Sequence, residues 1–338
     1  MALWLACHAA IALEVGVAPR APRHLGPRMI AEPPVVLVDD EEEMAAPVPG
    51  LGSAAGQPRR VPAQRLEGTG NPTVWSEFGA LAAETGAINL GQGFPEWQPP
   101  EFVVEQAVNA MAEGYNQYTR PAGHPNLVNV LARRYSGHLK REVDAQTEVA
   151  VTVGASQSLY LTLQALVNPG DEVILLEPAF DLYYGQVRLA GGKVVPVPLA
   201  VDADGMWQLD ADALDKAVTP RTKLLVLNSP HNPTGKVFTT AEMEAVADVV
   251  RRHPNLLVIS DEVYKFIVYA GAPHVHFASL PDMFERTVTL SSAGKTFSIT
   301  GWQTGWCVGP ARLIRPIQLL LPFVQFCVAT PMQQVVAH

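Results

Sequence analysis

Cysteine is scarce in this chain of 338 residues, which contains only Cys7, Cys307 and Cys327. Three cysteines so far apart match neither the paired cysteines of a disulfide-stabilised secreted domain nor the spacing of a zinc site. The sequence therefore predicts a protein of a reducing compartment without a metal site. We expect the cytoplasm, with the mitochondrion as the alternative.

Basic residues and long apolar runs are also few. The chain carries 24 Lys and Arg residues against 33 Asp and Glu residues, which gives a net charge of -9. This charge repels the phosphates of nucleic acids. No later apolar stretch reaches the length that a bilayer-spanning helix needs. Neither a nucleic acid nor a membrane is therefore expected as a partner.

Apolar residues, in contrast, make up 48% of the chain, and charged residues only 17%. This composition is typical of a well-packed globular protein. A chain of this length exceeds what one simple core usually holds. We therefore expect two lobes, or one large α/β domain with an appendage.

The first 64 residues differ from the rest. They begin with apolar residues, continue with Arg20, Arg23 and Arg28, and then combine many Pro, Gly and Ala residues with an acidic run at 39–43. Such a segment lacks the apolar pattern of a packed core. Two interpretations stay open for residues 1–64, a targeting peptide and an unstructured extension.

Two hydrophobic periods alternate along the remaining chain. Helical spacing of apolar residues is found at 74–84, 101–113, 125–141, 156–167, 241–253 and 313–326. Short apolar runs typical of buried strands are found at 149–154, 171–178, 193–199, 222–228, 255–260 and 286–292. Strands that alternate with helices predict an α/β fold, with a mostly parallel sheet, helices on both of its faces and the chemistry in loops at the strand ends.

Lys295 lies in the segment SSAGKTFSITGWQTGW, directly after a predicted strand. In a turn of small residues the backbone can approach a ligand closely, and a lysine amine that loses water becomes nucleophilic because its pKa falls. The segment therefore favours a lysine that forms a Schiff base with a cofactor. A surface lysine in a loop of Gly and Ser is the alternative.

Asp261 and Glu262 close the apolar strand NLLVIS. A carboxylate at this position costs free energy of desolvation unless it faces a cation, and a protonated pyridine nitrogen is such a cation. We predict this partner for Asp261 and expect Tyr264 to present its phenol to an oxygen of the same ring. Acids at strand ends are also common as solvated turn residues, and we interpret Glu262 in that way.

Three weaker signals lie at other strand ends. Asn232 has a side-chain donor for a phenolate oxygen, although Asn-Pro turns are common without any ligand. The amides of Gly154, Ala155 and Ser156 open a predicted helix, where they form either a phosphate seat or an ordinary turn. Phe180 either stacks on a flat ring or belongs to the core.

Together and in this order, these segments resemble the class I and II aminotransferases of fold type I, which depend on pyridoxal 5'-phosphate. More narrowly, they are similar to the group formed by kynurenine aminotransferase, glutamine transaminase K and cysteine-S-conjugate β-lyase. The resemblance rests on INLGQGFPEWQPP, YNQYTRPAGHPNL, EPAFDLYY, SPHNPTGKVF, SDEVY and SSAGKTFSITGW. A joint match of six ordered motifs is very specific.

The resemblance implies a catalytic role for three of these residues. Lys295 would bind the cofactor covalently and move a proton at the substrate α-carbon. Asp261 would pair with the ring nitrogen, and Tyr264 would hydrogen-bond the ring oxygen. The cofactor-binding residues implied in addition are Ala155, Ser156, Phe180, Asn232, Ser292, Tyr118 and Gln303. The substrate-binding residues implied are Gly93, Trp75 and Asn232.

The resemblance also implies a domain organisation and a partner. Residues 65–110 would begin a small domain and residues 111–338 would form the cofactor-binding large domain, while the rest of the small domain would be absent. Tyr118 would reach the site of a second subunit, which implies a homodimer. The small-molecule partners would be an amino acid and a 2-oxo acid.

The sequence departs from the family pattern at two places. Gln303 stands eight positions after Lys295, where the family usually has a basic residue that contacts the cofactor phosphate. A neutral amide cannot form a charge-assisted hydrogen bond, so we expect weaker cofactor binding. The second departure is the end at TPMQQVVAH, before the arginine that binds the substrate carboxylate in the family, and we expect this truncation to weaken substrate binding.

Three functions are compatible with these residues. The first is transfer of the amino group of kynurenine, glutamine or another apolar or aromatic amino acid to a 2-oxo acid. The second is β-elimination from cysteine S-conjugates at the same site. The third is a truncated protein without turnover that binds the cofactor or dimerises.

Overall fold

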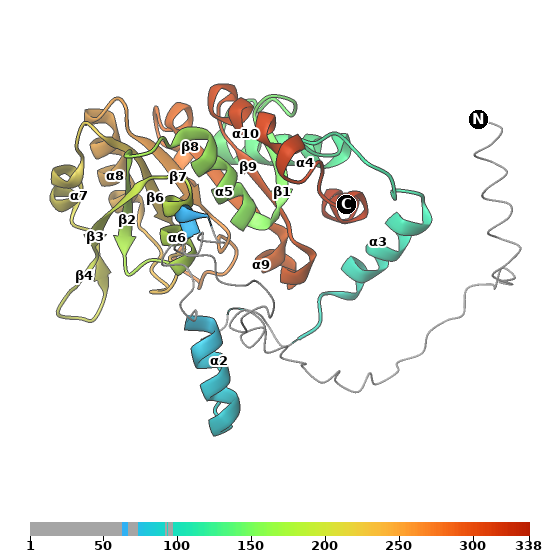
Figure 1. Ribbon diagram of the computed structural model, residues 1–338, viewed down its shortest axis with the longest axis horizontal. Coiled ribbons are helices and arrows are strands. Elements are labelled where there is room, and N and C mark those ends of the chain that lie inside the picture. The colour runs from blue at the N-terminus through green and yellow to red at the C-terminus, as the bar shows by residue number, and fades with distance from the viewer. Residues whose placement is uncertain (1–62, 67–73, 92, 94–96) are drawn as a thin grey trace, which may run out of the picture. The chain divides into compact units, whose positions relative to one another are not determined.

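The β-branched runs of the sequence form one seven-stranded sheet (Figure 1). The structure is a computed structural model that describes residues 63–66, 74–91, 93 and 97–338. The strands of this sheet are β1 (Val149–Val153), β2 (Glu172–Glu177), β3 (Lys193–Pro198), β6 (Thr222–Asn228), β7 (Leu257–Asp261), β8 (Thr287–Ser292) and β9 (Thr304–Val308). A separate hairpin consists of β4 (Ala200–Val201) and β5 (Trp207–Gln208).

Helices occupy most of the segments between these strands. The α-helices are α2 (Val74–Thr85), α3 (Glu101–Ala112), α4 (Pro125–Leu139), α5 (Gly154–Leu166), α6 (Asp181–Leu189), α7 (Ala211–Ala217), α8 (Thr240–Arg252), α9 (Ala293–Phe297), α10 (Ala311–Val324) and α11 (Thr330–Ala337). Short 3-10 helices lie at Gln64–Leu66, Phe277–Ser279, Phe284–Arg286 and Thr300–Trp302. The helices predicted at 74–84, 101–113, 125–141, 156–167, 241–253 and 313–326 are confirmed within a few residues at their ends.

The order of the strands is β1-β9-β8-β7-β6-β2-β3. Strand β9 runs antiparallel to both of its neighbours, β1 and β8, whereas the other pairs in the sheet are parallel. The predicted α/β fold with a mostly parallel sheet is therefore confirmed. Because parallel strands end at the same edge of a sheet, β6, β7 and β8 finish side by side.

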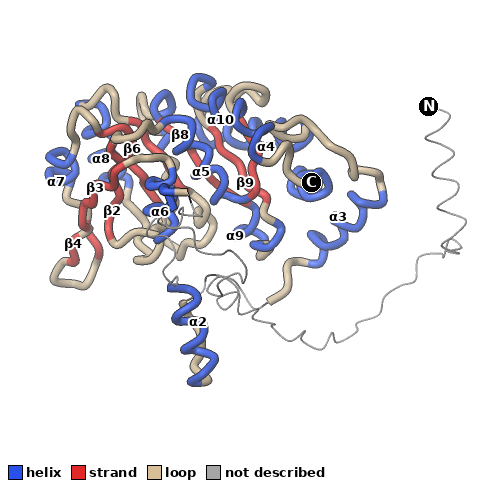
Figure 2. Tube along the Cα trace, in the orientation of Figure 1, coloured by secondary structure: helices blue, strands red, loops and turns tan. Residues whose placement is uncertain are grey.

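Side chains alternate between the two faces of the sheet, and helices cover both faces, as Figure 2 shows. In β6, Leu224 and Val226 join a core shared with α5, α6 and α10, whereas Leu225 and Leu227 join a core shared with α7 and α8. A third core lies under α3, α4 and α11, next to β1 and β9. The sheet is thus buried on both faces, which explains why its strands read as nearly continuous apolar runs.

Local sequence explains where some elements begin and end. Helix α8 opens with a capping box, in which Thr239 and Glu242 satisfy each other's backbone amides.

Strand β9 was not predicted from the sequence, and Lys295 lies in the short helix α9 and not in a turn. The extension predicted for residues 1–64 lies almost entirely outside the described residues. Among the described helices, none is long and apolar enough to cross a membrane.

Candidate active site

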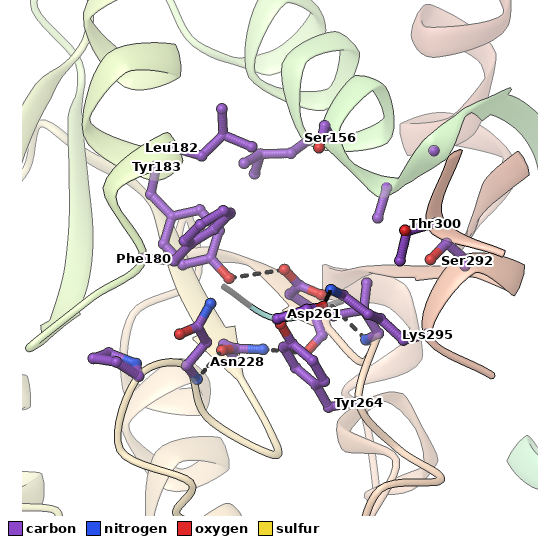
Figure 3. A pocket seen from close by; sticks show the side chains of 18 of the residues that line it. Ser156, Phe180, Leu182, Tyr183, Asn228, Asp261, Tyr264, Ser292, Lys295 and Thr300 are labelled. Atoms are coloured by element: carbon purple, nitrogen blue, oxygen red, sulfur yellow. Dashed lines mark hydrogen bonds between the residues drawn. The ribbon is translucent and has the colours of Figure 1, made fainter. Parts of the chain in front are cut away.

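The carboxyl ends of three neighbouring strands bring polar side chains to one edge of the sheet. Asn228 ends β6, Asp261 ends β7 and Ser292 ends β8. All three line one cavity of about 730 Å³, together with the start of α5 and with Lys295 from α9. Figure 3 shows the side chains of Asp261, Tyr264, Ser292 and Lys295 in this cavity. The cavity therefore lies where ligands bind in open α/β sheets.

Lys295 enters the cavity from the first turn after β8. Its Nζ donates a hydrogen bond to the carbonyl of Gly93 and lies 5.6 Å from the centre of the Tyr264 ring. Burial lowers the pKa of the Lys295 amine below its ordinary value. A larger fraction of the amine is therefore neutral at a given pH, and the neutral amine is the nucleophilic form. Gly93 therefore lines the cavity beside Lys295, and its predicted role on the substrate side stays a prediction.

Asp261 is a buried carboxylate at the floor of the cavity. Burial raises the pKa of its carboxyl group to about 6, although the Tyr183 hydroxyl, which donates to Oδ2 at 2.8 Å, and the Val263 amide act in the opposite direction. In the part of the chain that the structure describes, no ion pair reaches Asp261. A cationic ring nitrogen in the cavity would supply the missing positive charge, so the site fits pyridoxal phosphate.

Glu262, the next residue, was predicted to be a solvated turn residue, and this prediction is wrong. Its side chain is 1% exposed. Oε2 lies 2.6 Å from His276 Nδ1 and 3.2 Å from His274 Nε2, and Oε1 accepts from the Ser260 hydroxyl. The burial has a simple cause, because the loop after β7 folds back and brings two imidazoles to the carboxylate.

The predicted phosphate seat lies where α5 begins. Gly154, Ala155 and Ser156 all line the cavity. The amide of Gly154 already donates to the carbonyl of Gln303 at 2.8 Å, which leaves the later amides of the first turn for a ligand. Gly305 permits this close approach of β9 to α5, since a Cβ on Gly305 would lie 2.3 Å from the carbonyl carbon of Gly154.

Gln303 lies beside the phosphate seat. Its side chain lines the cavity, and its Nε2 donates to the carbonyl of Thr300. Among the described residues that line the cavity, Lys295 is the only Lys or Arg. A phosphate at the predicted seat would therefore meet only neutral hydrogen-bond donors, which include the amides of α5 and the hydroxyl groups of Ser156, Ser292 and Thr300.

The remaining predicted cofactor contacts come from three loops. Asn232, Phe180 and Tyr264 all line the cavity. Burial raises the pKa of the Tyr264 phenol, so it stays protonated and able to donate a hydrogen bond. The backbone N–H of Asn232 donates to Asn228 Oδ1 at 2.6 Å, which fixes the loop of Asn232 against the end of β6. Phe180 meets the Tyr183 ring edge-on, with 5.7 Å between the ring centres.

Of the predicted residues with a described side chain, Tyr118 does not line the cavity. Tyr118 is 81% exposed and packs against Phe326, with 4.8 Å between the ring centres. Its predicted role needs a second subunit, so it stays a prediction. Trp75 belongs to α2, and its side chain lies outside the described part of the chain.

Tyr183 and Asn228 also line the cavity, although neither was predicted from the sequence. Tyr183 belongs to the motif EPAFDLYY and donates to a carboxylate 78 positions further on. Asn228 ends β6, and its Nδ2 donates to the backbone carbonyl of Asp261 at 3.0 Å. A polar residue at the carboxyl end of an otherwise apolar strand was an available signal for Asn228, of the same kind that identified Asp261.

The chain is similar to curated proteins over most of its length. A kynurenine–oxoglutarate transaminase of Dictyostelium discoideum is 47% identical over 280 residues, which are 79% of this chain and 64% of the relative. Kynurenine–oxoglutarate transaminase 3 of Mus musculus is 45% identical over 284 residues, 82% of this chain and 62% of the relative. The chain thus spans somewhat less than two thirds of the length of these relatives.

The fold is also similar to solved structures. The N-succinyldiaminopimelate aminotransferase of Mycobacterium tuberculosis superposes with a TM-score of 0.77 at 43% identity, over 82% of this chain and 71% of that one. The family model for aminotransferase class I and II matches residues 85–338. This match covers most of the chain and includes every residue from Gly93 onward to which a role is assigned above. The chain therefore belongs to the aminotransferase class I and II family.

Proposed function

We propose that this chain binds pyridoxal 5'-phosphate and transfers the amino group of kynurenine, glutamine or another apolar or aromatic amino acid to a 2-oxo acid. The observation that carries the proposal is the shared cavity of Lys295 and Asp261. One offers an amine whose pKa is lowered by burial, and the other a buried carboxylate that lacks a cation. The names of the two curated relatives support the choice of kynurenine as a donor.

Some of these residues would hold the cofactor, and Lys295 would move the proton. When bound, the cofactor supplies an electron sink that stabilises negative charge at the substrate α-carbon. Asp261 would keep the positive charge of that ring in place, and Tyr264 and Asn232 would hydrogen-bond its oxygen. Lys295 Nζ takes the proton from the α-carbon and returns one during transfer. The backbone of Gly93, which accepts from Lys295 Nζ, limits where this amine can move.

The lining residues also favour an apolar or aromatic donor. Leu90, Phe180, Leu182 and Val263 face the same cavity as Lys295. They provide apolar surface for a donor side chain and exclude water from the reacting amine. We also propose a homodimer, in which the exposed Tyr118 contacts the cofactor of the partner subunit.

An absorbance spectrum tests the cofactor site. The purified chain is mixed with pyridoxal phosphate, and the spectrum is recorded before and after borohydride, with Lys295→Ala as the variant and Lys193→Ala, an exposed lysine of β3, as the matched control. After unbound cofactor has been removed, we expect an absorbance band that borohydride abolishes in the unmodified chain and in Lys193→Ala, and no such band in Lys295→Ala. A band that persists in Lys295→Ala would refute the role of Lys295.

A substrate assay tests the reaction. Kynurenine, glutamine and phenylalanine are offered with 2-oxoglutarate, and both the new amino acid and the new oxo acid are quantified. The proposal requires equal amounts of the two products. Pyruvate formed from a cysteine S-conjugate without any amino-group transfer would show that elimination is the activity of this chain.

A further inference from the structure

A second cluster of titratable side chains lies outside the set of residues that line the cofactor cavity. It consists of Glu262, which follows β7, and of His274 and His276 from the loop that precedes the 3-10 helix at Phe277–Ser279. One ligand atom from each of the three residues lies within 4.8 Å of the other two. We propose that this cluster binds a divalent transition-metal ion of the zinc type, independently of the cofactor.

The chemistry of the three side chains selects the ion. Two imidazoles and one carboxylate form a ligand set that is typical of Zn²⁺, whereas Mg²⁺ and Ca²⁺ prefer oxygen ligands. The Glu262 carboxylate lies against both imidazoles, with Oε2 at 3.2 Å from His274 Nε2 and 2.6 Å from His276 Nδ1, so the three ligand groups are already gathered at one point.

Hydrogen bonding within the chain does not satisfy the cluster. The His274 side chain is 6% exposed, and neither of its ring nitrogens forms a hydrogen bond of good geometry with any residue that the structure describes. Buried polar atoms without a partner are costly, so such a nitrogen is evidence for a missing ligand. Nε2 of His274 lies 3.2 Å from Glu262 Oε2, close to the separation of roughly 3.3 Å between ligand atoms around tetrahedral zinc.

A third imidazole lies next to the cluster. The ring of His138 stacks at 4.5 Å from the ring of His276, and its buried Nε2 has no hydrogen-bond partner in the described part of the chain. His138 therefore offers a further imidazole nitrogen beside His276.

The positive charge of Lys265 is the main feature that opposes the binding of a cation at this cluster. Its side chain is buried, but its Nζ is engaged, because it donates to the Tyr135 hydroxyl at 2.9 Å and faces the Tyr135 and Phe266 rings. The ligand atoms must also rearrange slightly, since His276 Nδ1 lies only 2.6 Å from Glu262 Oε2. This is a hydrogen-bond length, and zinc would have to open it by several tenths of an ångström.

A bound ion would have a clear structural effect. Glu262 is bonded to Asp261, and Tyr264 follows two residues later, so the ion would join the end of β7 to the loop at 274–276. The segment between these two points carries the phenol that faces the cofactor cavity. The ion would thus hold Tyr264 in place without touching the cofactor or the substrate.

Zinc binding is tested on the full chain, freed of metal by a chelator and kept without pyridoxal phosphate, because the cofactor itself binds metals. Zn²⁺ is titrated against a chromophoric competitor, and the melting temperature is recorded with and without Zn²⁺. We expect one ion per chain and a higher melting temperature with Zn²⁺. His274→Gln should weaken binding by more than about ten-fold, whereas His253→Gln, a histidine paired with Asp215 at the surface, should not change it.

Cobalt provides a second measurement that needs no variant. Co²⁺ added to the unmodified chain should produce visible absorption bands of an ion with nitrogen and oxygen ligands, and Zn²⁺ should remove them. The proposal is overturned if neither ion binds, or if binding persists unchanged in His274→Gln. Because no cofactor is present, this result is independent of the proposed transaminase activity.

Discussion

The hydroxyl of Tyr183 is the group that partly offsets the burial of Asp261. Without this hydrogen bond, the pKa of Asp261 should rise above about 6, because a bond to the charged form is lost. The ionised carboxylate would then exist only at higher pH. For Tyr183→Phe we expect the acidic limb of the kcat/KM profile to move upward by about one pH unit.

The neighbouring tyrosine provides the matched control. Tyr184 donates to Glu177 at 2.6 Å and does not line the cavity. Tyr184→Phe should therefore leave the acidic limb where it is in the unmodified chain. An unchanged profile in Tyr183→Phe would show that Asp261 does not control this limb.

Gln303 offers a second test at the scale of one residue. In Gln303→Lys an ammonium would lie beside the phosphate seat and add a charge-assisted hydrogen bond, so the affinity for pyridoxal phosphate should increase by about ten-fold or more. Fluorescence titration measures this affinity. Pyridoxal, which has no phosphate, should bind both forms equally, and an equal gain for pyridoxal would contradict the assignment of the seat.

The sequence predicted those site residues that a local pattern reveals. Lys295 follows a strand in a run of small residues, and Asp261 interrupts an apolar strand at its end. Tyr183 and the pairing of Glu262 could not be predicted in this way. Their partners lie 78 and at least 12 positions away, and only the folded loops bring them together.

At the scale of elements, the contact between β9 and the start of α5 depends on Gly305. A methyl group there would lie 2.3 Å from the Gly154 carbonyl carbon and 2.6 Å from the Ala155 nitrogen, so backbone would have to move. For Gly305→Ala we expect a loss of roughly 3 kcal/mol in the free energy of unfolding, measured by urea denaturation. Cofactor affinity should also fall, because the phosphate seat moves with α5.

Gly137 is the control for this substitution. It lies on the exposed side of α4, where an added Cβ meets no atom within 4 Å. Gly137→Ala should be neutral or stabilise the helix by about 0.5 to 1 kcal/mol. If both substitutions had the same small effect, the tight contact at Gly305 would not exist in solution.

Element prediction worked where the period was long and failed where it was short. The helices with three or more turns and the buried strands were visible in the apolar spacing. Strand β9 has five residues, as β1 and β7 do, but it begins with Thr304 and Gly305 and so lacks their continuous apolar run. Helix α9 has five residues directly after a strand, which are too few to show a helical period, so tertiary contacts determine both elements.

At the scale of the whole molecule, Asp261 should make stability depend on pH. Its folded pKa of about 6 lies above the ordinary value of 3.8, so the folded chain holds this proton more tightly than the unfolded chain. Stability is therefore lost as pH rises from about 4 to 6.5. The total loss is on the order of 3 kcal/mol, of which about 2 kcal/mol falls between pH 4.5 and 7.

Urea denaturation of the cofactor-free chain at pH 4.5 and pH 7 measures this loss. Asp261→Asn should lack this part of the decrease and be more stable than the unmodified chain at pH 7. Asp212→Asn, an exposed acid in the first turn of α7, should follow the unmodified chain. The effect of Glu262 has the opposite sign and appears mainly below pH 4.5, since its folded pKa is depressed.

The fold class followed from the alternation of strands and helices, but the order of the strands did not. Strand β9 lies between β1 and β8. It thereby joins β1, which leads into α5 and the predicted phosphate seat, to β8, which leads into α9 and Lys295. Nothing in the apolar pattern distinguishes this order from one in which β1 pairs directly with β8. The choice depends on side-chain packing across the whole sheet.

The position of β9 between β1 and β8 has a consequence for folding during synthesis on the ribosome. Strand β1 pairs only with β9 among the strands of the described sheet, and about 150 residues separate the two in sequence. Until residue 308 has left the exit tunnel, β1 has no strand to pair with and the two halves of the site stay apart. A nascent chain therefore cannot assemble the candidate cofactor site before almost all of its described residues have been synthesised.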